Sequence, residues 1–174
     1  IARVKDWADL NRRTADISPY RALVHKYLDE ERFFASPVDF GLMTARFPSF
    51  QPVEVRKRDI APGYLPQWIL ASSACFPMFP MCEIDGQNYL DGAYSDNLPI
   101  STAFRLGADR VIAIGLKPET PEKKYANHPL VTYIAPAEPL GKLLEFDLDA
   151  MRHSIVLGYT DTLRVLGDHI GRTY

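Results

Sequence analysis

Residues 71–99 read ASSACFPMFPMCEIDGQNYLDGAYSDNLP, and they carry most of the information in this chain of 174 residues. They place one acidic residue, Asp91, in a short loop that follows an apolar strand and precedes a helix. The dipeptide Asp91-Gly92 is typical of turns, because glycine adopts backbone angles that other residues resist. Taken alone, it indicates a turn whose carboxylate binds nearby amides. A carboxylate on a loop at a strand end is also where α/β enzymes hold catalytic groups.

The order of the motifs around Asp91 is more specific than any one of them. They are Ala71-Ser72-Ser73-Ala74-Cys75-Phe76-Pro77-Met78-Phe79-Pro80, Ile84-Asp85-Gly86, Tyr89-Leu90-Asp91-Gly92-Ala93, Asn97-Leu98-Pro99 and Leu106-Gly107-Ala108-Asp109. In this order and spacing they resemble the patatin-like phospholipase family of acyl hydrolases. The resemblance is firm from Asp39 to Leu116, looser as far as Gly167, and weak over residues 1–17.

The resemblance implies a serine–aspartate dyad in which Asp91 is the catalytic carboxylate. Gly92, Ala93 and Asn97 would support its loop. We interpret Asn97 as the cap of the helix that starts near Pro99, because Asn before Pro is a common helix boundary. Partial burial of Asp91 by Phe79, Tyr89 and Tyr94 would suit a general base, and Asp96 is expected to face solvent.

The family's nucleophile lies in a Gly-x-Ser-x-Gly turn, and no such motif occurs in the sequence. Ser72 and Ser73 lack flanking glycines and are interpreted as small packing residues, whereas Ser95 fits a turn. We therefore expect residues 1–174 to be the C-terminal part of a single patatin-like domain. Its upstream half would be a partner that supplies the serine and the oxyanion hole.

Alternating helix and strand patterns predict an α/β fold, and the resemblance implies a three-layer α/β/α sandwich. Helices are predicted from Ser18, with Ser18 as N-cap, from Pro66 to Ala74, from Pro99 to Leu106 and from Leu148 to Leu166. Strands are predicted at 38–45, 52–56, 110–116 and 131–135, with a hairpin at 83–89 around Asp85-Gly86. The apolar run at 110–116 is typical of a strand buried on both faces.

The proposed substrate class is a lipid or fatty-acyl ester. Phe76, Met78 and Phe79 are candidates for an apolar acyl pocket, and peripheral contact with a membrane is expected. The dyad chemistry needs neither a metal nor a cofactor. The scattered histidines, His25, His128, His153 and His169, share no motif with one another.

Composition excludes several other classes. A net charge of −2 with 24% charged residues gives no reason to expect nucleic acid as a partner. The one basic run, Arg56-Lys57-Arg58, is interpreted as a solvated strand end, and no apolar stretch is long enough to span a membrane. Cys75 and Cys82 fit free thiols in a reducing compartment, so a cytoplasmic location is expected.

Two alternatives to the acyl hydrolase stay open at the level of sequence. One is a non-catalytic relative of the family that serves as an interaction module, because the nucleophile is not visible. The other is an unrelated open α/β binding domain, because a fold does not determine a function. A Gly-x-Ser-x-Gly motif upstream would favour the hydrolase, and a glycine-rich phosphate loop would favour the binding domain.

Overall fold

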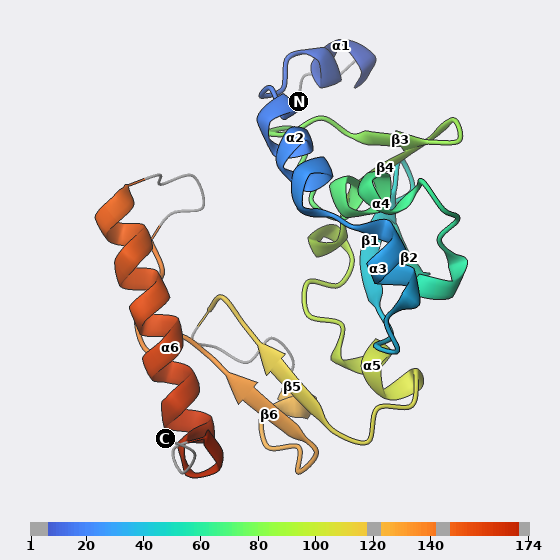
Figure 1. Ribbon diagram of the computed structural model, residues 1–174. Helices are drawn as coiled ribbons and strands as arrows, with labels where there is room; N and C mark the ends of the chain where they lie inside the picture. The colour runs from blue at the N-terminus through green and yellow to red at the C-terminus, as the bar shows by residue number, and fades with distance from the viewer. Residues whose placement is uncertain (1–6, 118–122, 142–146, 171–174) are drawn as a thin grey trace. The chain divides into compact units, whose positions relative to one another are not determined.

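The computed structural model describes residues 7–117, 123–141 and 147–170, and the chain divides into two compact units at residues 97 and 98. Both units contain helices and strands, so the predicted α/β class is confirmed (Figure 1). The first unit holds Asp91 and a four-stranded sheet. The second holds a two-stranded sheet and a long helix.

The first unit is built around an antiparallel sheet with strand order β2-β1-β4-β3. Its strands are β1 (Gly41–Arg46), β2 (Gln51–Arg56), β3 (Cys82–Ile84) and β4 (Gln87–Asp91). Its helices are α1 (Trp7–Arg12), α2 (Ser18–Tyr27), α3 (Glu30–Ala35) and α4 (Leu65–Ser72), with short 3₁₀ turns η1 (Lys57–Asp59) and η2 (Gly92–Tyr94).

The turn between β3 and β4 confirms the predicted hairpin. Asp85 has φ 51° and Gly86 has φ 75°, and two successive left-handed residues define the turn that matches the twist of paired strands. Ile84 pairs with Gln87 and Cys82 with Tyr89, which carries β4 back toward β1. Thr44 of β1 then lies opposite Asp91, so the sheet register itself sets the position of this carboxylate.

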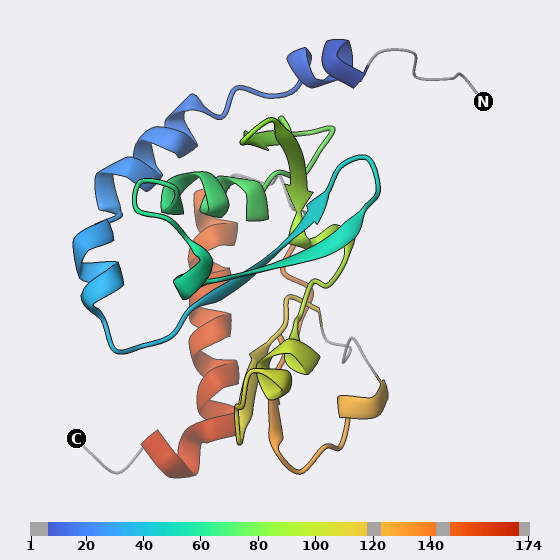
Figure 2. The ribbon, with the colours of Figure 1, turned by 90° about the vertical axis from the view of Figure 1, so that its right-hand side faces the viewer.

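Helix α4 covers one face of this sheet, as Figure 2 shows for α4 beside the β1–β2 hairpin. Pro66 stands in its first turn, where the missing N–H costs nothing. Its apolar side includes Leu65, Leu70 and Ala71, all buried. Ala71 packs with Ile84 and Tyr89 in one cluster of the core. This packing fixes the end of α4, from which the chain runs directly past Asp91.

The second unit contains α5 (Ile100–Arg105), β5 (Val111–Ile114), η3 (Lys123–Tyr125), β6 (Val131–Ile134) and α6 (Leu148–Ile170). Strands β5 and β6 pair in parallel, from Val111 opposite Val131 to Ile114 opposite Ile134. Gly107 follows Leu106, the C-cap of α5, and its φ of 97° is the left-handed conformation that commonly ends a helix.

Helix α6 packs through a different face from the one that its sequence predicts. Apolar residues recur along α6 at spacings of three or four, which is typical of one packed face. Of these, Met151, Ile155 and Tyr159 are exposed in the structure, whereas Leu163 and Leu166 are partly buried. Among residues 148–167 of this helix, Leu157 and Asp161 are buried. The carboxylate of Asp161 accepts a hydrogen bond at 2.8 Å from the N–H of Ala137, just beyond β6. A buried polar anchor therefore selects the packed face, against the apolar pattern.

Two further expectations need correction. The N-cap of α2 is Ile17, not Ser18, and the Asp16 carboxylate accepts hydrogen bonds from the N–H and hydroxyl of Ser18. Strand β5 is not buried on both faces. Ala113 is buried, whereas Ile112 and Ile114, which share the opposite face of the strand, are exposed.

Candidate active site

Asp91 is held by its backbone on two sides. It ends β4 opposite Thr44 of β1, and its N–H donates to the carbonyl of Ala74 at 3.0 Å. Asp91 is also the N-cap of η2, and its Oδ1 accepts a hydrogen bond of 2.8 Å from the N–H of Ala93. Oδ2 accepts no hydrogen bond from the residues that the structure describes. One oxygen is thus fixed, and the other is left for a further donor.

Gly92 is required for a reason that the sequence does not reveal. It lies outside the left-handed region, so the expected special backbone angle is not what demands glycine. The residue is buried, and a Cβ at this position would lie 2.3 Å from the carbonyl oxygen of Met43 in β1. The loop therefore rests directly on the backbone of β1, and any side chain at residue 92 would push it away.

Thr44 reinforces the same contact from inside the sheet. It is fully buried, and its hydroxyl donates to the carbonyl of Leu90, the residue before Asp91. The same oxygen lies 3.4 Å from the carbonyl of Ala71 in α4. The sequence prediction did not include Thr44. The available signal was a polar β-branched residue among the apolar residues of a predicted strand.

A thiol and a phenol lie in the electrostatic field of Asp91. Burial raises the pKa of the Cys75 thiol, and the negative charge of Asp91 raises it further. Burial also raises the pKa of the Tyr94 phenol, and electrostatic interaction with Cys75 and Asp91 raises that pKa further. Tyr94 donates its hydroxyl hydrogen bond to the carbonyl of Phe76. Both groups are therefore neutral at pH 7.

The other two aromatic residues that were expected beside Asp91 lie elsewhere. Tyr89 is 8% exposed and stacks edge-on against Trp68, with ring centroids 5.1 Å apart, so it belongs to the core. Phe79 lines a cavity between α2 and α4. Tyr94 is the member of the predicted set that approaches Asp91. Cys75 was missed, because nothing in the sequence shows that it returns to this loop.

The residues after η2 close the loop by backbone hydrogen bonds. The N–H groups of Ser95 and Asp96 both donate to the carbonyl of Gly92 at 2.9 Å, and the Ser95 hydroxyl does so at 3.1 Å. Ser95 is thus part of the turn, as expected, whereas Asp96 is partly buried and does not simply face solvent. The capping interpretation of Asn97 is wrong. The N-cap of α5 is Pro99, which has no side-chain hydrogen bond, and Asn97 is exposed.

Ser72 and Ser73 hold α4 in place. The Ser72 hydroxyl donates to the carbonyl of Met43 at 2.8 Å, which joins α4 to β1. The Ser73 hydroxyl donates to the carbonyl of Ile69 at 3.0 Å within its own helix. These contacts agree with the interpretation of both residues as packing elements at a helix end.

The three acyl-pocket candidates have different environments. Phe76 is 7% exposed and packs with Ala45 and Leu90 in the core. Phe79 lines a cavity of about 350 Å³, and neither Phe76 nor Met78 is among the residues that line it. Met78 is partly exposed, and its carbonyl accepts a hydrogen bond of 2.8 Å from Ala15. Nearby, Asn11 Oδ1 accepts a hydrogen bond of 2.7 Å from the N–H of Met81.

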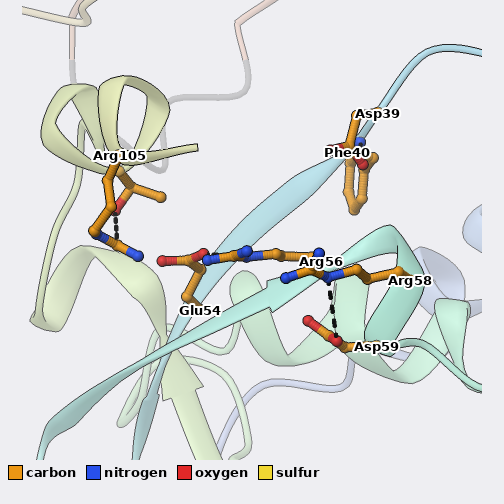
Figure 3. Close-up of polar contacts among 8 residues, drawn as sticks. Asp39, Phe40, Glu54, Arg56, Arg58, Asp59 and Arg105 are labelled. Atoms are coloured by element: carbon orange, nitrogen blue, oxygen red, sulfur yellow. Dashed lines mark hydrogen bonds and ion pairs between the residues drawn. The ribbon is translucent and has the colours of Figure 1, made fainter. Parts of the chain in front are cut away.

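The basic run at the end of β2 is occupied by local contacts. Arg56 Nε lies 2.6 Å from Glu54 Oε1, and Lys57 Nζ donates to the carbonyl of Ser36 at 2.6 Å. Arg58 points toward Asp59, with Nε 3.8 Å from Oδ1 (Figure 3). These charges are paired with residues of the same unit, which gives no support for an anionic polymer as a partner.

Two kinds of site are absent from the described residues. No group of three or more His, Cys, Asp or Glu side chains in residues 7–117, 123–141 and 147–170 could hold a metal ion. Within the same ranges, no helix combines the length and apolar character that crossing a membrane requires. Cys75 and Cys82 are free thiols and both are partly exposed.

Comparison with known proteins adds one finding to this geometry. The family model described as patatin-like phospholipase matches residues 5–104, a range that includes Asp91 and all four strands of the first unit. The match begins within residues 1–17, where the sequence motifs were uninformative, and stops before β5. No curated protein matches the chain. The matched range exceeds half of the sequence, and this chain therefore belongs to the patatin-like phospholipase family, whose general function is lipid acyl hydrolysis.

Proposed function

We propose that the protein hydrolyses lipid acyl esters through a serine–aspartate dyad, and that Asp91 is its general base. The observation that carries the proposal is the state of the carboxylate. Oδ1 is fixed by the N–H of Ala93, and Oδ2 accepts no hydrogen bond from the described residues. A base needs this combination, since its position must be fixed while one oxygen remains able to accept the serine proton.

The chemistry divides into two steps. The serine oxygen attacks the ester carbonyl while Asp91 Oδ2 takes the hydroxyl proton, and that proton then passes to the leaving alcohol. Water next attacks the acyl-enzyme and gives its proton to Asp91, which returns it to the serine as the fatty acid leaves. The neutral Cys75 and Tyr94 groups do not compete with Asp91 as bases at pH 7.

The serine must come from outside residues 1–174, because the sequence has no Gly-x-Ser-x-Gly motif. We accordingly take residues 1–174 as the C-terminal part of one catalytic domain, whose upstream half would complete the three-layer sandwich. The two free thiols suit a reducing compartment, which supports the cytoplasm as the location.

Labelling with a fluorophosphonate tests this arrangement. The full-length protein should be labelled on one serine within an upstream Gly-x-Ser-x-Gly motif, because only an activated hydroxyl attacks the probe. Residues 1–174 alone should show neither labelling nor esterase turnover. Peptide mapping by mass spectrometry identifies the site. Stoichiometric labelling of a serine within residues 1–174 would contradict the proposal, and a full-length protein that is never labelled would favour a non-catalytic interaction module.

The proposed acyl pocket has a separate test. Phe76, Met78 and Phe79 would form an apolar wall, and each methylene that it buries contributes about 0.8 kcal/mol. Turnover of p-nitrophenyl esters should therefore rise from acetate to medium chains. Met78→Ala should move the optimum to longer chains, because the smaller side chain enlarges the pocket. Met78 is chosen because it is partly exposed and does not line the cavity that Phe79 lines. A preference for acetate over octanoate, or an unmoved optimum in the variant, would place the acyl chain elsewhere.

A further inference from the structure

Four aromatic rings follow one another from α1 to the loop of Asp91. The ring of Trp7 lies 5.3 Å from that of Phe47, Phe47 lies 6.2 Å from Phe50, and Phe50 lies 6.0 Å from Tyr94. Two of these residues come from the β1–β2 turn, one from α1 and one from η2. We call Trp7, Phe47, Phe50 and Tyr94 the aromatic ridge.

The aromatic ridge packs against the core of the first unit, and three of its rings are also exposed. Trp7 also contacts the buried ring of Phe76 at 6.2 Å, and Phe47 packs against the cluster that contains Phe76. Despite these contacts, Trp7 is 44% exposed, Phe50 is 47% exposed and Tyr94 is 43% exposed. The rings are thus fixed by the core of the first unit, while three of them present a large apolar area to the surroundings.

The backbone of Phe50 adds an independent observation. Its φ of 56° lies in the left-handed region, which glycine and asparagine adopt easily and a bulky aromatic residue does not. Its N–H closes the turn by donating to the carbonyl of Arg46 at 2.7 Å. A phenylalanine here is unfavourable for folding and gains little burial in return. Unfavourable conformations of this kind occur where a side chain serves a function.

The ridge ends at the proposed catalytic carboxylate. Tyr94 belongs to η2, the turn that begins at Asp91, and its phenol lies within the field of that carboxylate. A lipid that reaches Asp91 leaves a lipid–water interface, where rings with an apolar body and a polar edge are favoured. The exposed charge nearest in sequence to Phe50 is Arg46, whose cation suits the phosphate of a lipid head group.

We propose that the aromatic ridge is the surface by which the protein binds the lipid–water interface, with Phe50 as its most exposed anchor. This inference rests on the proposed function, because it assigns the ridge to delivery of lipid to Asp91. The occupant is the surface of a lipid aggregate. The ridge holds a vesicle against the loop of Asp91 and takes no part in the chemical step.

The variant Phe50→Gly tests the proposal without destabilising the turn, because glycine favours the φ that Phe50 adopts. Sedimentation of the full-length protein with phosphatidylcholine vesicles should show binding about tenfold weaker in the variant. Hydrolysis of vesicle lipid below saturation should fall by the same factor. Turnover of soluble p-nitrophenyl butyrate should change by less than about twofold, since the ester reaches Asp91 without an interface.

Tyr27→Ala is the matched control. Tyr27 is more exposed than any ring of the ridge, at 71%, and among the described residues its ring contacts none of the four ridge rings. This variant should sediment with vesicles as the unaltered protein does. Failure of the unaltered protein to bind vesicles, equal binding by Phe50→Gly, or an equal loss on butyrate and vesicle lipid would each overturn the proposal. A ridge covered by another part of the full-length protein would give the first of these results.

A different variant tests the proposed function separately from the aromatic ridge. Asp91→Asn should lose turnover of both substrates and still sediment with vesicles. If Asp91→Asn keeps its activity, the dyad proposal fails, while sedimentation of Phe50→Gly still reports on the ridge alone.

Discussion

Replacing Asp91 by Asn in the full-length protein is expected to lower the acylation rate by about 10²–10⁴-fold, the usual contribution of a positioned general base. The amide can still accept a hydrogen bond from the N–H of Ala93 through its oxygen, so the loop should keep its conformation. The NH₂ group that replaces Oδ2 cannot take a proton from the serine. Rapid-mixing measurement of the acyl-enzyme burst with a p-nitrophenyl ester isolates this step.

Asp96→Asn is the matched comparison, since Asp96 lies in the same loop and donates its N–H to the carbonyl of Gly92. That bond belongs to the backbone and survives the substitution, so the rate should fall less than in Asp91→Asn. A loss below about tenfold in Asp91→Asn would assign Asp91 to the turn alone. An essential Asp96 with a dispensable Asp91 would show that the family motif has been placed on the wrong residue.

Gly92→Ala is expected to damage both stability and activity. The new Cβ would lie 2.3 Å from the Met43 carbonyl oxygen, which belongs to the backbone of a paired strand and cannot rotate away. Relief of this overlap requires the loop to move, at a cost of about 1–3 kcal/mol in the free energy of unfolding. Displacement of a catalytic group by about 1 Å can lower a rate by about 10²-fold. Urea unfolding and steady-state turnover measure the two effects.

Gly41→Ala provides the control for Gly92→Ala within β1 itself. A Cβ at Gly41 would meet the carbonyl oxygen of Val55 at 3.8 Å, an ordinary van der Waals distance. This variant should unfold close to the urea concentration of the unaltered protein and keep its turnover. Equal tolerance of alanine at residues 41 and 92 would mean that the loop of Asp91 does not rest on β1.

Local sequence patterns predicted the elements whose structure is decided locally. The hairpin at Asp85-Gly86 forms as expected, because two residues with positive φ are enough to specify that turn. Helix α4 and strand β2 begin within one residue of the predicted positions. The spacing of apolar residues in α6 does not predict its packed face. The hydrogen bond from Ala137 to Asp161 depends on the segment after β6, which the sequence of the helix does not reveal.

The candidate site shows the same division. Asp91 could be identified because a family motif surrounds it, and the matching family model covers the same residues. The reason for Gly92 could not be found, since the sequence describes the angles that glycine permits and does not show what approaches it. Cys75 and Thr44 come near Asp91 only after α4 and β1 have packed, and no spacing along the chain encodes that proximity.

The two hydrogen bonds that tie Asn11 and Ala15 to residues 78–81 have a consequence for exchanging parts between related enzymes. The segment that carries Met78 and Phe79 is held in place by residues more than sixty positions earlier in the chain, so it is not a separable module. A chimaera that imports this segment from a relative should import residues 7–15 with it. Loop grafts that respect only sequence continuity would leave the backbone groups of Met78 and Met81 without the partners that shape this part of the surface.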